Sequence, residues 1–172
     1  MRTIAWHLPW KTSEDAPHAL LDILRGCNIR CDACYNRGAD GVKSLRQIEK
    51  DLDVLQSLRR VQSISLVGGE VTLHPELCEI VRRVKARGLC VEIFTNGLLL
   101  EPPLLAALAE AGTDLVFLHI DRGQTRPDLP QPGSPQALRA LIDRKAALVA
   151  KHGMDAGLTM TAYGCGTEDI VD

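Results

Sequence analysis

Five short apolar runs alternate with four longer amphipathic stretches along this chain, and this alternation limits its possible folds more than any other feature. The short runs are bounded by glycine, asparagine or aspartate, which is typical of strands, and the longer stretches carry apolar residues at helical spacing. The five expected strands cover residues 19–24, 61–67, 90–95, 115–120 and 155–161. Because strands that alternate with helices form right-handed βαβ units, we expect an α/β fold with a parallel sheet and helices outside it.

Capping residues and prolines mark where the expected helices begin. Ser44 and Gln47 have the spacing of a capping box, and apolar residues then recur every three or four positions up to Leu58. Proline lacks the amide that a first helical turn leaves unused, so it is expected to open the other three helices, near residues 75, 102 and 135.

The length of the chain decides how much of a barrel these units can form. An eight-stranded (β/α) barrel typically needs about 250 residues, so the 172 residues present predict a partial, TIM-like (β/α) barrel with about five parallel strands. We expect residues 1–18 to be an N-terminal lead-in segment and residues 19–172 to be one core domain. The fifth strand would then leave an open edge, which residues 162–172, a partner chain or a further C-terminal region would have to cover.

Charge and hydropathy exclude two classes of partner. The formal net charge of -2 gives no basic excess for a nucleic-acid surface. No apolar run approaches the roughly 18 residues of a membrane span, and Arg2, His7 and Pro9 interrupt the only stretch placed to be a secretory signal. The sequence therefore predicts a soluble, cytoplasmic protein.

Three of the six cysteines, Cys27, Cys31 and Cys34, lie within one eight-residue stretch after the first expected strand. Steps of four and three residues let three thiolates converge on one centre, whereas a disulfide would use only two of them. Three ligands suit a metal cluster with one open position, because a structural site normally closes with four. The alternative is a structural zinc site with Cys165 as the fourth ligand, which fits this spacing and context less well.

Glycine and polar residues follow the later strands as well. Because ligand sites in parallel α/β folds form at the carboxyl ends of the strands, we expect these residues to converge on the cysteine loop. They are Gly68, Gly69 and Glu70 after the second strand, Thr95 and Asn96 at the end of the third, His119 and Asp121 around the end of the fourth, and Thr159 in the fifth.

In this order and placement, Cys-x3-Cys-x2-Cys, Gly-Gly-Glu and Thr-Asn-Gly resemble the motifs of radical S-adenosylmethionine (radical SAM) enzymes. Residues 65–77 are similar to that family's second-strand motif nearly residue for residue, and the resemblance extends from about residue 20 to residue 161. It implies a [4Fe-4S] cluster on Cys27, Cys31 and Cys34 whose fourth iron chelates the amino and carboxylate groups of S-adenosylmethionine (SAM). An electron from a donor such as flavodoxin or ferredoxin would then split the sulfonium, and the 5′-deoxyadenosyl radical would take hydrogen from an organic substrate.

The resemblance also implies roles for the strand-end residues. Gly68 and Gly69 would let the backbone approach a ligand, and Glu70 would bind the methionine ammonium. Thr95 belongs to the same expected cofactor site, and Asn96, His119, Asp121 and Thr159 are candidates to bind ribose or carboxylate. One departure concerns Ala33, which stands where the family usually has an aromatic residue, with Tyr35 one place beyond the last cysteine. A second departure concerns the sixth strand of the family core, because only five strands are expected in this sequence.

Simpler explanations remain open for several of these residues. Gly68 to Glu70 is also compatible with an ordinary turn, Asn96-Gly97 is a common turn dipeptide, and His119 and Asp121 could pair with each other or with Arg122. Arg122 and Arg126 are compatible with an anionic group nearby, although charged side chains on a solvated loop are the simpler explanation.

For the whole chain, the alternative to an enzyme is a non-catalytic iron–sulfur or metal-binding module, or a truncated family member that acts as a partner subunit. Tyr163 and Cys165 are candidate hydrogen-atom donors, for which a packing ring and a surface thiol are the simpler explanations.

Overall fold

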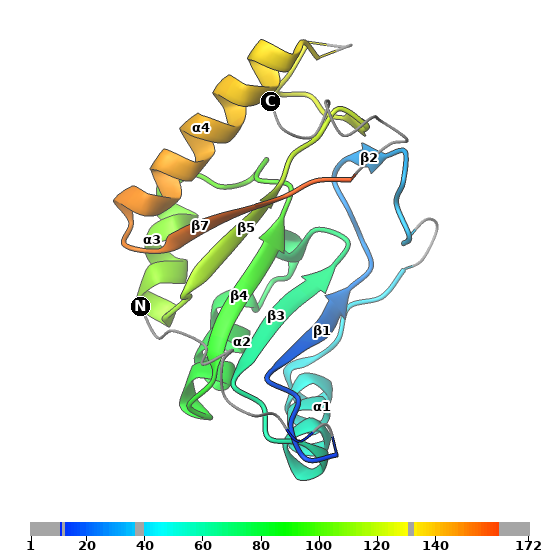
Figure 1. The fold of residues 1–172 in the computed structure, drawn as a ribbon, viewed down its shortest axis with the longest axis vertical. Helices are drawn as coiled ribbons and strands as arrows, with labels where there is room; N and C mark the ends of the chain where they lie inside the picture. The colour runs from blue at the N-terminus through cyan, green and yellow to red at the C-terminus, as the bar shows by residue number, and fades with distance from the viewer. Residues whose placement is uncertain (1–10, 12, 37–39, 131–132, 162–172) are drawn as a thin grey trace.

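A five-stranded parallel sheet forms the centre of the protein in a computed structural model that describes residues 11, 13–36, 40–130 and 133–161 (Figure 1). The strand order is β1-β3-β4-β5-β7, and every neighbouring pair is parallel. The strands are β1 (His18–Leu24), β3 (Ser63–Gly68), β4 (Cys90–Thr95), β5 (Leu115–His119) and β7 (Asp155–Thr159). This arrangement confirms the predicted α/β fold with about five parallel strands.

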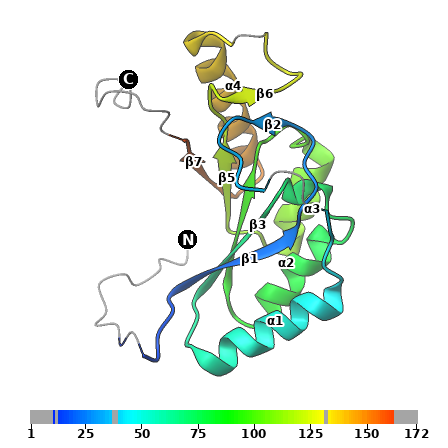
Figure 2. The same cartoon turned by 90° about the vertical axis from the view of Figure 1, so that its right-hand side faces the viewer.

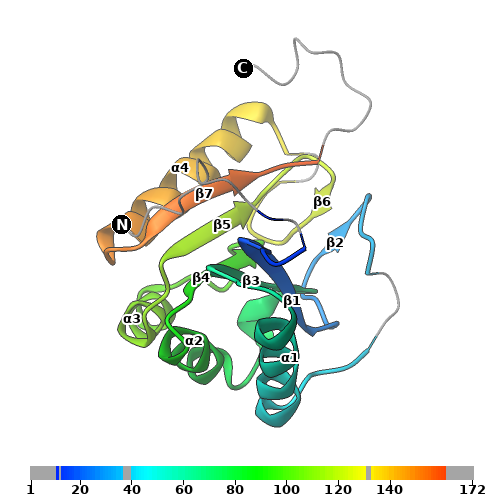
Figure 3. The same cartoon turned by 60° about the horizontal axis from the view of Figure 1, so that its bottom comes forward.

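Four helices cover one face of the sheet, as Figures 2 and 3 show from two sides. They are α1 (Leu45–Leu58), α2 (Leu77–Ala86), α3 (Pro102–Ala111) and α4 (Pro135–Lys151), and each connects two successive strands of the sheet. No helix among the described residues is long and apolar enough to cross a membrane.

The hydrophobic core lies between the sheet and these helices. Strand residues alternate between the two faces of the sheet, so every second residue of the inner strands is fully buried under a helix. The strand contribution consists of Leu21, Ile23, Ile64, Leu66, Val91, Ile93, Val116 and Leu118, and the helix contribution includes Ile48, Leu52, Ile80, Val84, Leu105 and Leu108. Each fully buried side chain of this size contributes about 1.5–3 kcal/mol relative to exposure, and this packing keeps the strand ends at one edge.

Most of the predicted helix boundaries are confirmed. Ser44 and Gln47 form the reciprocal capping box of α1, and Ser134 accepts a hydrogen bond from the Ala137 amide at the start of α4. Gly112 ends α3 with φ 98°, in the left-handed region that favours glycine.

The prediction for α2 was wrong by two residues. The helix begins at Leu77, and Pro75 lies in a turn between it and a 3₁₀ helix, η1 (Val71–Leu73). The His74 ring explains the delay, because its Nδ1 accepts a hydrogen bond from the Glu76 amide at 3.1 Å while its Nε2 contacts the Lys43 carbonyl oxygen at 2.8 Å. These contacts hold the segment between His74 and Glu76 as a turn.

Two very short strands were not predicted. β2 (Arg30–Cys31) and β6 (Gln124–Thr125) form an antiparallel pair outside the main sheet, and this pair joins the cysteine loop to the segment that follows β5.

The two edge strands of the main sheet are β1 and β7. β1 begins one residue earlier than expected, inside the predicted lead-in segment. Residues 162–172, one of the three candidates to cover the β7 edge, lie outside the described residues, and this range includes Tyr163 and Cys165.

Candidate functional site

A cavity of about 260 Å³ lies at the edge of the sheet where the parallel strands end. The cysteine loop, the ends of β3 and β4, and residues after β5 and β7 all contribute to its wall. The lining residues are Cys27, Ile29, Cys31, Ala33, Cys34, Tyr35, Val67, Gly68, Gly69, Glu70, Phe94, Thr95, Asn96, His119, Gln124 and Thr161. Nine of the eleven residues expected to form a site therefore share one cavity, and the other two, Asp121 and Thr159, do not line it.

The cysteine loop is fixed to the end of β3 by backbone contacts. The Gly69 amide donates a hydrogen bond to the Leu24 carbonyl oxygen at 2.8 Å, and the Glu70 amide donates one to the Gly26 carbonyl oxygen at 2.9 Å. A Cβ added at Gly68 or Gly69 would overlap the carbonyl oxygens of Leu24 and Gly26. The close approach of the cysteine loop therefore explains why residues 68 and 69 are glycine, and the sequence alone did not suggest this explanation.

The three thiols face the same cavity without being gathered into a ligand set. Cys27 is exposed, Cys31 and Cys34 are half-buried, and none of the three forms a disulfide. Within the described ranges, no group of three or more His, Cys, Asp or Glu side chains is arranged to hold a metal ion. Three thiols on one loop are a donor set that an iron–sulfur site could use, and their sulfur atoms would have to move closer together to share one cluster.

Burial has a strong effect on the central thiol. Burial, followed by the nearby Cys27, Asp121 and Cys34, raises the pKa of Cys31 to about 11, while Arg126 acts in the opposite direction. The thiol is therefore protonated at neutral pH, and binding as a thiolate would release a proton.

Glu70 is a buried carboxylate held by four hydrogen bonds. Its side chain is 1 % exposed, and Oε1 accepts hydrogen bonds from the Thr72 amide, the Thr72 hydroxyl and the Thr95 hydroxyl at 3.1, 2.5 and 2.6 Å. Oε2 accepts the Asn96 amide at 2.7 Å. Among the described residues this is its one partner, so Oε2 keeps capacity for a further donor. Thr95 acts on the site by orienting this carboxylate.

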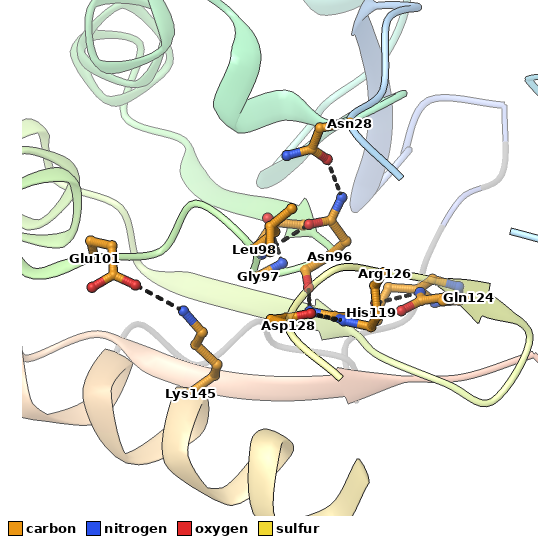
Figure 4. A network of polar contacts seen from close by, with 11 residues as sticks. Asn28, Asn96, Gly97, Leu98, Glu101, His119, Gln124, Arg126, Asp128 and Lys145 are labelled. Carbon is orange, nitrogen blue, oxygen red and sulfur yellow. Dashed lines mark hydrogen bonds and ion pairs between the residues drawn. The ribbon is translucent and has the colours of Figure 1, made fainter. Parts of the chain in front are cut away.

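Asn96 tethers the cysteine loop to the end of β4 (Figure 4). Its side-chain amide donates a hydrogen bond to Asn28 Oδ1 at 2.8 Å, and its Oδ1 accepts the Leu98 amide at 2.9 Å. Gly97 follows with φ 76°, so the turn that the Asn-Gly dipeptide predicted is also present. One side chain therefore both shapes the turn and contacts the loop.

His119 lines the cavity and is contacted by two residues behind it. Its Nε2 lies 3.3 Å from Asp121 Oδ2, and its Nδ1 lies 3.2 Å from the Thr159 hydroxyl. Asp121 is buried and accepts hydrogen bonds from the amides of Gly123 and Thr161 at 2.9 and 3.2 Å. The simpler of the two explanations, a pair between His119 and Asp121, is confirmed, and this pair orients the imidazole at the cavity wall.

Sequence reasoning missed Gln124 and misjudged Arg126. Gln124 lines the cavity opposite Cys31 in the β2–β6 pair, and its side-chain amide donates a hydrogen bond to the His119 carbonyl oxygen at 2.8 Å. Arg126 was expected to be a solvated loop charge, but its side chain is 0 % exposed and its Nε lies 2.6 Å from Asp128 Oδ1. A two-residue strand has no periodicity, so nothing in the sequence marked Gln124, and the burial of Arg126 depends on contacts with distant residues that the sequence does not reveal.

Two aromatic features complete the wall. The Phe94 ring packs against Phe117 with centroids 4.6 Å apart, and the alternation of β4 could have placed Phe94 on this face because Ile93 points into the core. Tyr35 is 74 % exposed, and its hydroxyl donates a hydrogen bond to the Gly68 carbonyl oxygen at 3.1 Å. The loop therefore presents an aromatic ring to the cavity even though Ala33 carries none.

Comparison with known proteins decides which family has this arrangement. The family model of the radical SAM superfamily matches residues 21–169. The chain belongs to this superfamily. Membership implies SAM and an iron–sulfur cluster as cofactors, and it does not favour the alternative of a non-catalytic iron–sulfur or metal-binding module.

Relatives of this radical SAM chain include proteins with several named activities. It is 33 % identical over 105 residues to the tungsten-containing aldehyde ferredoxin oxidoreductase cofactor-modifying protein of Pyrococcus furiosus, a match that covers 59 % of this chain and 30 % of the relative. It is 40 % identical over 103 residues to the GTP 3′,8-cyclase of Chlorobaculum tepidum, covering 58 % and 31 %. The matches thus span about a third of the length of these relatives.

A solved structure supports the fold. Streptococcus suis SuiB bound to S-adenosylmethionine superposes with a TM-score of 0.68 at 18 % identity, covering 92 % of this chain and 37 % of SuiB. At this sequence identity, the structural similarity to SuiB supports the partial-barrel fold of the chain but carries no information about its substrate.

Proposed function

We propose that this chain binds a [4Fe-4S] cluster through Cys27, Cys31 and Cys34 and uses it to cleave SAM reductively, which starts hydrogen abstraction from an organic substrate. The observation that carries the proposal is the shared cavity, whose wall contains all three thiols, the glycine pair and Glu70. When bound, the reduced cluster would supply the single electron that breaks a carbon–sulfur bond of the sulfonium.

The chain's own residues fit the two cofactors. Three thiols on one loop leave one iron of a four-iron cluster without a protein ligand, which is the position that the amino and carboxylate groups of SAM would take. Glu70 would accept the SAM ammonium on Oε2, in a charge-assisted hydrogen bond to a carboxylate that Thr95 and the Asn96 amide already orient.

The other side of the cavity would bind the rest of the molecule. His119, oriented by Asp121 and Thr159, and Asn96 are placed to contact polar groups such as ribose hydroxyls or the carboxylate. The Tyr35 ring would supply the flat apolar contact for adenine that Ala33 cannot. The substrate would enter where this wall opens, and an electron donor such as flavodoxin or ferredoxin would reach the cluster from the exposed Cys27 side.

The test starts with anaerobic reconstitution of the protein with iron and sulfide. We expect a brown protein with about four irons and a broad visible absorption that bleaches with dithionite, and we expect 5′-deoxyadenosine once SAM is added. Cys31→Ala should lose both the colour and the product. Cys78→Ala is the matched control because Cys78 lies on α2, outside the cavity wall.

Three outcomes would count against the proposal. A colourless protein, or bound zinc, would refute the cluster. A stable cluster that yields no nucleoside with SAM would support a non-catalytic family member instead. Equal iron content in the Cys31→Ala and Cys78→Ala proteins would refute the ligand assignment.

A further inference from the structure

The guanidinium of Arg126 lies at a junction of the segments that form the cavity, although Arg126 itself does not line it (Figure 4). Its Nη2 donates a hydrogen bond to the Asn96 carbonyl oxygen at 3.0 Å, and its Nη1 donates one to Gln124 Oε1 at 2.8 Å. Its Nε and Nη2 also contact the two carboxylate oxygens of Asp128, at 2.6 and 2.9 Å. The side chain is completely buried.

Each of the two uncharged partners leads directly to the cavity wall. Asn96 donates its amide to Glu70 Oε2 and its side chain to Asn28, inside the cysteine loop. Gln124 holds the His119 carbonyl oxygen with its side chain, while its backbone pairs with Cys31. Arg126 is therefore one hydrogen bond away from both the residue whose amide contacts Glu70 and the residue whose backbone pairs with that of Cys31.

We propose that Arg126 is a positioning residue, which sets the distance between the Glu70 carboxylate and the cysteine loop and so determines how SAM meets the cluster. This inference rests on the proposed function. A guanidinium suits the task because it is planar and rigid and presents five donors, so it can bind a backbone carbonyl, a side-chain amide and a carboxylate at fixed angles.

The energetics of buried ion pairs support a geometric role. Arg126 is completely buried, while 21 % of the Asp128 side chain is exposed. Taking the guanidinium out of water offsets much of the attraction between the two charges, so well-packed apolar side chains at such a place often give equal stability. Apolar side chains could not form the hydrogen bonds that Arg126 donates to Asn96 and Gln124. The main effect of losing Arg126 should therefore be on the geometry of the cavity.

The principal test is the double variant Arg126→Gln/Asp128→Asn, which removes the pair without leaving a buried unpaired charge. Arg139→Gln is the control, because it makes the same arginine substitution in an exposed pair, with Asp143 on α4. The first measurement is amide hydrogen exchange in the protein without cofactors. We expect at least tenfold faster exchange at the Asn96 amide and at the Asp32 amide, which donates to the Gly123 carbonyl oxygen beside the β2–β6 pair, and no change in the control.

The second measurement follows reconstitution. We expect an iron content equal to that of the wild type, a KM for SAM at least tenfold higher with a smaller change in kcat, and a weaker change in the electron paramagnetic resonance spectrum of the reduced cluster when SAM is added. A role confined to stability would lower the melting temperature and leave the KM and the spectrum unchanged. Arg126→Lys, which keeps the charge but not the planar set of donors, should give an intermediate KM.

The outcomes separate this inference from the proposed function. Exchange rates and a KM equal to those of the Arg139→Gln control would overturn it. If the wild type binds no cluster, the proposed function fails, and faster exchange at the two amides would still show that Arg126 positions these segments. If the double variant does not fold, Arg126→Lys takes its place, and wild-type exchange and KM in that protein would contradict the inference.

Discussion

Replacing Gly69 by alanine should disconnect the cysteine loop from the sheet. The added Cβ would overlap the Gly26 carbonyl oxygen and would lie 2.6 Å from the Arg25 carbonyl oxygen. Both contacts are with backbone, which cannot rotate away as a side chain would. The loop therefore has to move outward, and the hydrogen bonds from the amides of Gly69 and Glu70 have to lengthen or break.

The size of the effect follows from these contacts. Overpacking of a close interface costs about 1–3 kcal/mol, and each of the two threatened hydrogen bonds contributes about 0.5–1.5 kcal/mol, which together give about 2–6 kcal/mol. At about 2–4 °C per kcal/mol for a chain of this size, the melting temperature should fall by about 10 °C. Iron bound after reconstitution should fall as well, because Cys27 follows the displaced Gly26.

Gly26→Ala provides the matched control. The two glycines face each other across the same contact, but a Cβ at Gly26 meets nothing within 4 Å, so this protein should melt close to the wild-type temperature. Thermal unfolding followed by circular dichroism, with iron analysis of the same samples, measures the difference. If both variants melt within about 2 °C of each other, the close approach of the loop does not explain why glycine occupies residue 69.

Three further predictions concern the cavity and its support. Glu70→Gln should destabilise the protein by about 1–3 kcal/mol, since one amide hydrogen would face a buried donor, and should raise the KM for SAM at least tenfold; an unchanged KM would remove Glu70 from the site. Tyr35→Phe loses one exposed hydrogen bond to Gly68, so denaturant unfolding should change by less than about 1 kcal/mol, and a larger loss would mean that the hydroxyl holds the loop. Arg126 lowers the pKa of Asp128, so the stabilisation from this carboxylate is present above its unfolded pKa of about 3.9 and is lost as the pH falls through the lower folded value. The stability difference between wild type and Asp128→Asn should therefore shrink below about pH 4, and urea unfolding that shows a constant difference from pH 6 to pH 2.5 would contradict this.

Local sequence signals predicted the framework because each of them acts within a few residues. The capping box at Ser44, the glycine at residue 112 and the alternation within β4 need no knowledge of distant parts of the chain. The parallel sheet then followed from the order of strands and helices, and it placed nine predicted residues on one cavity.

The features that were missed all depend on contacts between segments far apart in sequence. The β2–β6 pair joins residues more than ninety positions apart through only two residues on each side, which is too short for a periodic signal. The burial of Arg126 depends on Asn96, thirty positions away. A charged residue in a loop rich in proline is normally solvated, so only the fold itself could show the exception.

The anchoring of the cysteine loop indicates which sulfur has to move for the thiols to converge. Cys31 is fixed by the β2–β6 pair, and Cys34 accepts the Asn36 amide at 3.4 Å while Asn36 is buried and bonded to Arg25. Cys27 follows the Gly26 anchor and is the exposed member of the three. Because rotation of an exposed side chain costs little compared with breaking a strand pair, the loop can complete a ligand set mainly through Cys27. The β2–β6 pair and the Asn36 contacts would then hold the sulfur atoms of Cys31 and Cys34 in place.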